Sequence, residues 1–175
     1  IDSEGSELLR IDSSGRVMMG TTAASTLTST DDLTISTSGS TGITLFSGTG
    51  YAGNITFGDG TSGDDRQRGL LQYHHSDHSM RFFTNAVRRM TIDSDGRVLI
   101  GTTTEGQSSA DDLTIEGSGN TGITVRSGTS NTGNLYFSDG TSSTAEYQGF
   151  IEYDHSGNFL RFGTAASERL RITSD

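Results

Sequence analysis

The segment from residue 69 to residue 100 has the sequence GLLQYHHSDHSMRFFTNAVRRMTIDSDGRVLI, in which apolar and polar residues alternate. A period of two is typical of β-strands that bury one face. Turn-forming residues divide the segment at Ser76–Ser79, Asn85-Ala86 and Ser94–Gly96, and glycine favours the left-handed conformation that closes a hairpin. The pattern therefore predicts a meander of four short strands. The residues expected on its apolar face are Leu71, Tyr73, Met80, Phe82, Thr84, Met90, Ile92, Val98 and Ile100, with Arg81, Arg89 and Arg97 opposite.

This pattern belongs to an internal repeat. From Asp31 onward the chain repeats at an offset of 80 residues, and residues 31–95 and 111–175 are identical at 33 of 65 positions. Before Asp31 the offset is 81, which indicates a loop between Thr22 and Asp31. We expect residues 1–30 to end a preceding repeat with its hairpin and connector, residues 31–110 to form repeat 1, and residues 111–175 to form repeat 2 and begin a third. We expect the chain to be a piece of a longer protein.

Residues 31–62 contain three shorter candidate strands, DLTI at 32–35, GITL at 42–45 and GNITF at 53–57, separated by Gly, Ser and Thr. One chain offers these strands little to pack against. Closing three chains around a threefold axis would give them a shared interior and would remove exposed strand edges. We therefore expect an all-β, elongated fibrous homotrimer of tandem β-meander and β-hairpin repeats. Intertwined triple β-helix segments and side-by-side packing both remain open at this point.

The composition agrees with a fold that completes its core by association. Leu, Ile, Val and Phe number 35 of 175 residues, the formal net charge is −10, and Pro, Cys, Trp and Lys are absent. So few apolar residues fit either a disordered chain or an oligomeric one, and the strict alternation favours the second. The acidic balance argues against nucleic acid and anionic membranes as partners. No apolar run approaches the roughly 20 residues that span a bilayer, so we expect no membrane insertion.

Two copies of one motif carry a resemblance to a known family. GLLQYHHS at 69–76 and GFIEYDHS at 149–156 run into MRF or LRF, and residues 88–103 continue as RRMTIDSDGRVLIGTT. This resembles the repeated module of phage tail fibres and related virion proteins, abundant in marine and cyanobacterial phages. The resemblance implies a trimeric β-fibre on an extracellular virion, with flanking repeats and other tail proteins as partners. The family usually has Ser-Pro after Gly-Thr-Thr, whereas Ala23 and Thr104 stand here, and the module also occurs in bacterial surface proteins.

Two groups of residues have the chemistry of a metal site. Asp93-Ser94-Asp95-Gly96 resembles the start of a calcium loop, but position 12 of that loop is Thr104 and the nearest acid is Glu105. A hairpin turn explains this segment better. His74, His75 and His78 lie close in sequence, and repeat 2 keeps His155 alone of the three. We favour histidines at a strand end, with three copies of one His or Asp around a trimer axis as an alternative ion site.

The paired acids Asp31-Asp32, Asp64-Asp65 and Asp111-Asp112 are candidate glycosidase carboxylates. Adjacent residues on a strand point to opposite faces, and the Trp that often lines a sugar cleft is absent, so solvated acids explain these pairs better. Asn54-Ile55-Thr56 matches a glycosylation sequon. We predict that the chain is not an enzyme and has no catalytic, cofactor-binding or metal-binding residue and no cofactor.

Three functions are consistent with these observations. The first is a structural shaft of a tail fibre or similar virion appendage that projects a tip for host-receptor binding. The second is a receptor-binding or adhesive module that contacts host surface glycans through the loops 62–68 and 143–148, which differ most between the repeats. The weakest is a tailspike that cleaves polysaccharide.

Overall fold

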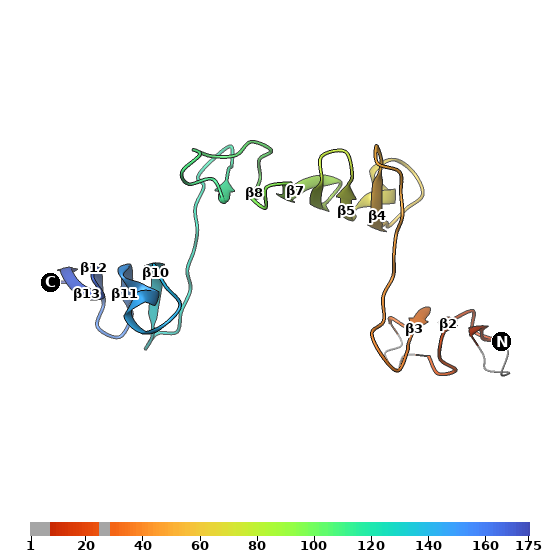
Figure 1. The fold of residues 1–175 in the computed structure, drawn as a ribbon, viewed down its shortest axis with the longest axis horizontal. Coiled ribbons are helices and arrows are strands. Elements are labelled where there is room, and N and C mark those ends of the chain that lie inside the picture. Colours follow the sequence, from red (N-terminus) through yellow and green to blue (C-terminus); the bar gives the residue numbers. More distant parts are fainter. Residues whose placement is uncertain (1–7, 25–28) are drawn as a thin grey trace. The chain divides into compact units, whose positions relative to one another are not determined.

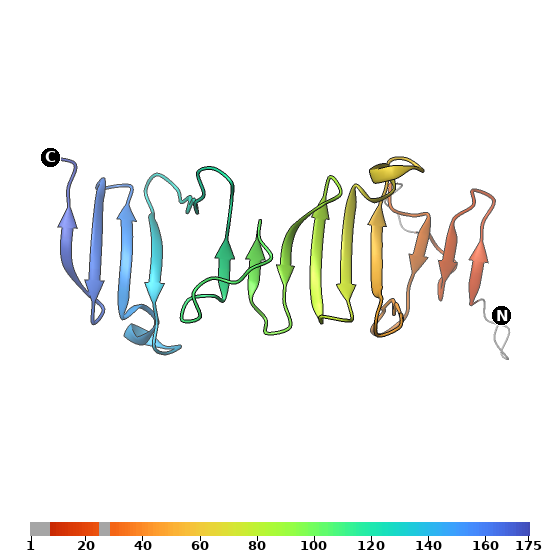
Figure 2. The same ribbon diagram turned by 90° about the horizontal axis from the view of Figure 1, so that it is seen from above.

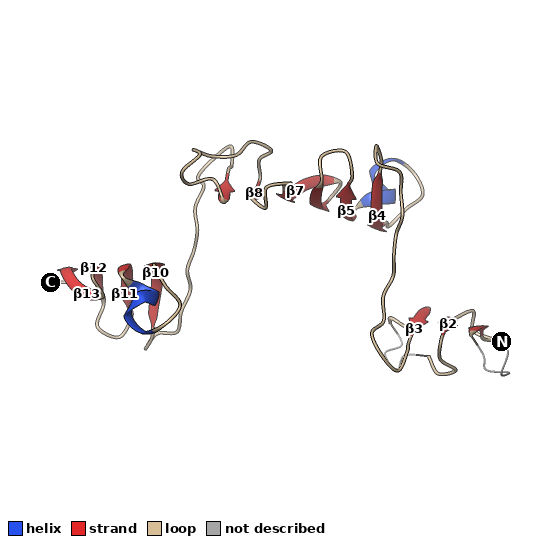
Figure 3. Ribbon diagram, viewed as in Figure 1, coloured by secondary structure: helices blue, strands red, loops and turns tan. Residues whose placement is uncertain are grey.

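The computed structural model describes residues 8–24 and 29–175, and within them the chain folds as thirteen β-strands in three sheets, with two 3₁₀ helices and no α-helix (Figures 1 and 3). The all-β prediction is therefore confirmed. The same residues contain no helix long and apolar enough to cross a membrane. The chain divides into two compact units, Ile1–Thr114 and Ile115–Asp175.

The first sheet consists of β1 (Leu9–Ile11), β2 (Val17–Met19) and β3 (Leu33–Ile35). β1 and β2 form an antiparallel hairpin, and β3 pairs with β2 in parallel. The hairpin turn places Gly15 at φ +82°, the left-handed region that favours glycine. The loop predicted between Thr22 and Asp31 connects the two parallel strands, and its residues 25–28 lie outside the described residues.

The second sheet has the strand order β4-β5-β6-β7-β8-β9, and its first five strands are antiparallel. The four-strand meander predicted over residues 69–100 is confirmed as β5 to β8, which lie side by side in Figure 2. Asn85 and Ala86 close the β6–β7 turn with φ of +51° and +57°, and Gly96 closes the β7–β8 turn. The strand bounds are β4 (Ala52–Phe57), β5 (Gly69–His74), β6 (Ser79–Thr84), β7 (Val87–Ile92), β8 (Val98–Ile100) and β9 (Leu113–Ile115).

The third sheet is an antiparallel meander in chain order and corresponds to β4–β7 at an offset of 80 residues. Its strands are β10 (Thr132–Phe137), β11 (Gly149–Asp154), β12 (Phe159–Thr164) and β13 (Ser167–Ile172). In both repeats a 3₁₀ helix connects the first two strands: η1 (Gly63–Gln67) before β5 and η2 (Ser143–Tyr147) before β11. The loops 62–68 and 143–148 are thus single helical turns with the same backbone path.

One strand prediction is wrong for the chain taken alone. The GITL segment at residues 42–45 and its counterpart at 122–125 form no strand, whereas the neighbouring predictions at 32–35 and 53–57 are confirmed as β3 and β4. A strand needs a neighbour to satisfy its backbone N–H and C=O groups, and this segment has no ladder partner within one chain. The three sheets of the described chain are also open, and none closes on itself.

Candidate functional site: an uncovered apolar sheet face

The chain buries very little apolar surface. In residues 8–24 and 29–175 the buried apolar side chains are Met18, Leu99 and Phe150, while 24 large apolar residues are exposed. The chain exposes 12639 Å², whereas a folded monomer of its mass exposes about 8,000 Å² and two separate domains of half that mass about 10,000 Å². The chain therefore leaves many large apolar side chains in contact with water.

Strand register gathers the apolar residues of the second sheet into two rows. Ile55, Leu71, Phe82, Met90 and Ile100 are cross-strand neighbours in the first row. The second row, one pair along the strands, is Gly53, Tyr73, Met80, Ile92 and Val98. The predicted apolar face is therefore confirmed. It is only partly covered, with Phe82 36% and Ile55 45% exposed.

Arg89 departs from the predicted alternation. A β-bulge between Phe82 and Phe83 leaves Arg89 without a cross-strand partner in β6. Its Nε donates to Thr84 Oγ1 at 3.2 Å, so the side chain reaches the end of the apolar face instead of the opposite face. Arg169 makes the same bond to Thr164 at 3.0 Å in repeat 2. Period-two counting misses the bulge because one extra residue reverses the alternation.

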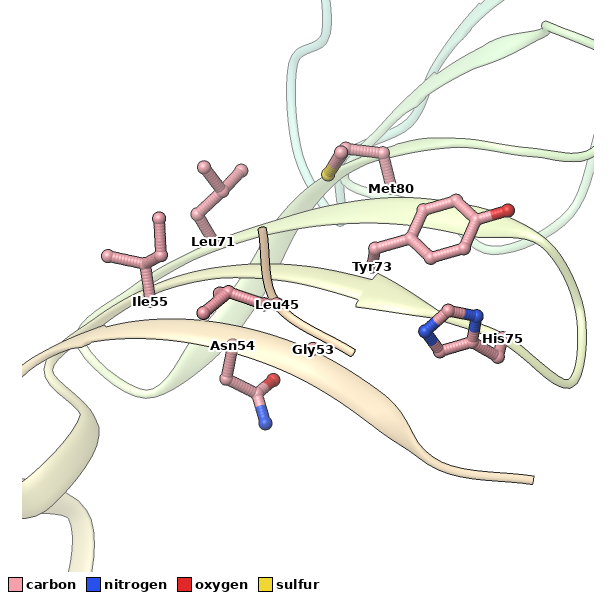
Figure 4. A pocket seen from close by; sticks show the side chains of 8 residues that line it. All are labelled: Leu45, Gly53, Asn54, Ile55, Leu71, Tyr73, His75 and Met80. Carbon is pink, nitrogen blue, oxygen red and sulfur yellow. The ribbon is translucent and has the colours of Figure 1, made fainter. Parts of the chain in front are cut away.

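The apolar face has the same shallow hollow in both repeats. The first has a volume of about 270 Å³, and Figure 4 shows Leu45 of the strandless segment beside Ile55, Leu71, Tyr73 and Met80. The second has a volume of about 290 Å³ and is lined by the residues 80 positions later. These are Val125, Gly133, Asn134, Leu135, Ile151, Tyr153, His155 and Leu160. Every apolar lining residue of one repeat is thus apolar in the other.

The opposite face differs between the repeats. In repeat 1, Gln72 on this face donates to Asn54 at 2.9 Å. In repeat 2 the equivalent position is Glu152, which forms an ion pair with Arg161. The apolar face is therefore the constant feature of the repeat, and the polar face varies.

The candidate calcium loop is a hairpin turn in which one arginine binds two aspartates, an arrangement that we call an arginine clasp. Asp93 Oδ1 accepts hydrogen bonds from the backbone N–H of Asp95 at 3.0 Å and of Arg97 at 2.9 Å, and its Oδ2 accepts Arg97 Nε at 2.7 Å. Arg97 Nη1 also donates to Asp111 at 3.3 Å, which ties the hairpin to the start of repeat 2. Burial acts to raise the pKa of Asp93, but the hydrogen bonds from Arg97 outweigh it and hold the pKa below its usual value. Both oxygens are thus occupied by the chain itself.

The same clasp precedes β3. Arg16 Nε donates to Asp12 at 2.7 Å, and its Nη1 donates to Asp31 at 2.9 Å. The hydrogen bonds from Arg16 lower the pKa of Asp12. Asp31 is buried under this contact and is an ion-pair partner of Arg16, so the prediction that the first acid of the Asp31-Asp32 pair is solvated is wrong. Asp111, the first acid of the Asp111-Asp112 pair, is half-buried and is an ion-pair partner of Arg97, so the prediction of a solvated acid is wrong there as well.

The remaining candidate residues have separate partners. His74 Nδ1 lies 2.9 Å from Ser76 Oγ, His78 Nδ1 lies 3.2 Å from the Tyr73 hydroxyl, and the His75 ring meets Tyr73 edge-on at 4.9 Å between centroids. Over the described part of the chain, no group of three or more His, Asp or Glu is placed to hold a metal ion. Asp65 forms an ion pair with Arg68, and Asp64 is exposed on η1. Asn54 of the sequon lies within β4.

A further cleft, on the polar face of β6–β8, was not predicted. It is lined by residues that include Arg88, Thr91 and Glu105, which strand register and the connector after β8 bring together. No protein-family model and no curated protein matches this chain, so its function is argued from the two sheet faces and the internal repeat.

Proposed function

We propose that the chain is a shaft segment of a homotrimeric fibre, in which three copies turn their apolar sheet faces toward a shared interior. The observation that carries this proposal is the apolar hollow that recurs at the same eight positions of both repeats while the polar face changes. A binding site for a foreign ligand would be needed once, whereas an assembly interface is needed in every module of a rod.

We infer that another copy of the chain covers this apolar face. Exposed apolar faces of this extent are unstable in water and mark association sites. A copy of the same sheet has a matching apolar face of equal length, and three such faces can enclose one core. The strandless segments 36–51 and 116–131 would line that core and find backbone partners in neighbouring chains. Their exposed apolar residues include Ile43, Leu45, Ile123 and Val125.

The same segments bear on whether the three chains intertwine. Residues 41–48 of the first segment contain no turn and span up to about 30 Å when extended, which is enough to carry a chain from one side of such a fibre to another. We therefore favour intertwined chains over three chains packed side by side. Intertwining would also explain why GITL has strand sequence but no strand partner within its own chain.

The biological setting is proposed from the resemblance of the repeated motif to phage tail-fibre modules. In that setting the segment catalyses no reaction, lies outside the cell on the virion, and holds a host-binding tip away from the particle. Its partners would be its own copies, the flanking repeats and other tail proteins. Its acidic surface suits this passive role because like charge keeps fibres soluble and apart.

The decisive experiment measures mass and shape together. Light scattering across a wide dilution range gives the number of chains, and small-angle X-ray scattering gives the cross-section of the particle. We expect three chains in a rod that resists dilution. A monomer or a dimer at every concentration would refute the proposal.

A second candidate function is adhesion through η1 and η2. Both turns share one backbone path, closed by hydrogen bonds from Asp65 N to Ser62 O and from Ala145 N to Ser142 O, each 3.2 Å. Their exposed side chains differ, with Asp64 and Arg66 in one turn and Glu146 in the other. Exchanging the two turn sequences would alter cell binding if they contact a receptor and would leave it unchanged in a shaft.

A further inference from the structure

The polar face of repeat 1 contains a cleft with the features of a binding site. Its volume is about 430 Å³, and its walls come from β6, β7, β8 and the connector that follows β8. Two of its arginines are already neutralised within the chain. Arg81 pairs with Asp77, and Arg97 pairs with Asp93 at 2.7 Å. The remaining charges in the cleft are Arg88 and Glu105.

Arg88 is a half-buried cation, and the part of the chain that the structure describes offers it no carboxylate within ion-pair distance. A guanidinium that is partly removed from water gains most from a carboxylate, which its planar fork binds through two hydrogen bonds. Arg66, Arg89, Arg126 and Arg169 also have no ion pair among the described residues, but they are exposed, whereas Arg88 is half-buried. The position therefore favours an external anion.

Thr91 supplies a second, independent sign of a ligand. It is 6% exposed, it lies in the wall of the cleft, and among the described residues its hydroxyl has no hydrogen-bond partner. A buried hydroxyl without a partner costs free energy and is normally satisfied by a water or a ligand. Its cross-strand neighbours are Arg81 and Leu99, both of which also line the cleft.

Repeat 2 lacks both features at the equivalent positions. Arg88 corresponds to Glu168 and Thr91 to Arg171, and these two side chains pair with each other at 2.7 Å. Arg171 also stacks on Phe159, with its guanidinium carbon 4.0 Å from the ring centroid. The counterparts of β6 and β7 in repeat 2 thus carry a self-neutralised pair where repeat 1 carries Arg88 and Thr91. A purely structural role would not require this difference.

We propose that the cleft binds a hydroxyl-rich carboxylate, of the class of an acidic monosaccharide unit, with Arg88 as the carboxylate-binding residue. The cleft is lined mainly by polar side chains, which favours a hydroxylated ligand over an apolar acid. Glu105 is exposed and accepts hydrogen bonds from ring hydroxyls, while solvent screens its charge from the carboxylate. The Thr91 hydroxyl gains a partner when the neighbouring side chains adjust around the ligand. The inference does not depend on the proposed trimer.

The test is a titration of the whole chain with D-glucuronate, and with D-glucose as the neutral match, followed by saturation-transfer NMR and calorimetry. We expect one glucuronate site per chain and binding of glucose that is weaker by at least about tenfold, because a charged hydrogen-bond pair is lost. Arg88→Gln is expected to lower glucuronate affinity by at least about tenfold. Arg89→Gln is the matched control, because it removes the same charge one residue away and is expected to leave the affinity unchanged.

Thr91→Val distinguishes a ligand role from a structural one. The variant keeps the shape of the side chain and removes a hydroxyl that has no partner in the free chain, so we expect weaker glucuronate binding with no fall in the thermal midpoint. The proposal is overturned if glucuronate shows no saturable binding, or if the Arg88 and Arg89 variants lose affinity equally. It is also overturned if Arg88→Gln changes the mass of the particle and leaves glucuronate affinity intact, since the carboxylate would then come from a neighbouring chain.

Discussion

Two variants, each with an aspartate on one face of β4, distinguish a sheet that lines a shared apolar interior from a sheet that is exposed to solvent. Ile55 and Thr56 are adjacent in this strand, and both are exposed in the single chain, but their side chains point to opposite faces. Ile55 lies in the apolar row beside Leu71, and Thr56 lies opposite Leu70 on the other face. If the sheet acts alone, Ile55→Asp and Thr56→Asp have similar small effects.

The fibre hypothesis predicts a large difference in stability between the two variants. Full burial of an isoleucine side chain stabilises by about 1.5–3 kcal/mol, so covering the 45% that a single chain leaves exposed adds about 1 kcal/mol per copy. A buried, unpaired carboxylate costs several kcal/mol more. Because a trimer contains three copies of the change, Ile55→Asp is expected to cost the assembly on the order of 10 kcal/mol. Thr56→Asp stays in water and is expected to change the stability by less than about 1 kcal/mol.

Mass by light scattering and strand content by circular dichroism measure the two consequences independently. We expect Ile55→Asp to give single chains or aggregates at concentrations where the parent and Thr56→Asp remain trimeric. If Ile55→Asp forms trimers with the same mass and stability as the parent, the assignment of this face to the interior is refuted.

Three further predictions address the sheets themselves. A Cβ on Gly163 would lie 2.0 Å from the Phe150 ring, so Gly163→Ala should destabilise by about 1–3 kcal/mol, and combination with Phe150→Leu should restore most of it in a double-mutant cycle. Ala86→Gly should raise the thermal midpoint, because Ala86 has φ +57°. Because the folded pKa of Asp93 is lowered, the stabilisation that its carboxylate provides is present above about pH 4 and is lost as the pH falls below it. The free energy of unfolding of Asp93→Asn, measured by urea titration, should therefore depend less on pH in this acidic range.

The meander could be predicted because its information is local. Alternation, glycine at the Gly96 turn and the Asn85-Ala86 turn each act within a few residues, and all three agree on the same strands. The bulge at Arg89 could not be predicted in this way, because its signal is a register between two strands. The arginine clasp was missed for a similar reason. Asp93 and Arg97 are close in sequence, but the third member, Asp111, is brought to them by β9.

The GITL segment shows a different limit of sequence reasoning. Ile43 and its neighbours have a strand pattern, and the prediction of a strand was wrong for one chain because the hydrogen-bond partners are absent from that chain. The cleft beside Arg88 was missed, although Arg88 and Thr91 lie in the repeated motif, because its walls come from separate strands and a connector. The comparison of Arg88 with Glu168 in the two repeats was available in the sequence, but its meaning depends on knowing that Thr91 lies beside it in the folded sheet.

The proposed assembly gives the low apolar content and the faces of the sheets one physical explanation. A monomer with two-layered sheets needs apolar residues on both layers, and 35 Leu, Ile, Val and Phe in 175 residues are too few for that. A sheet whose single apolar face is covered by identical faces needs no second layer from its own chain. The equivalence of the two hollows, where Leu45 is replaced by Val125 and Met80 by Leu160, agrees with this requirement, because size varies there and apolar character does not. A disordered chain would have no reason to keep that face constant while its polar face changes.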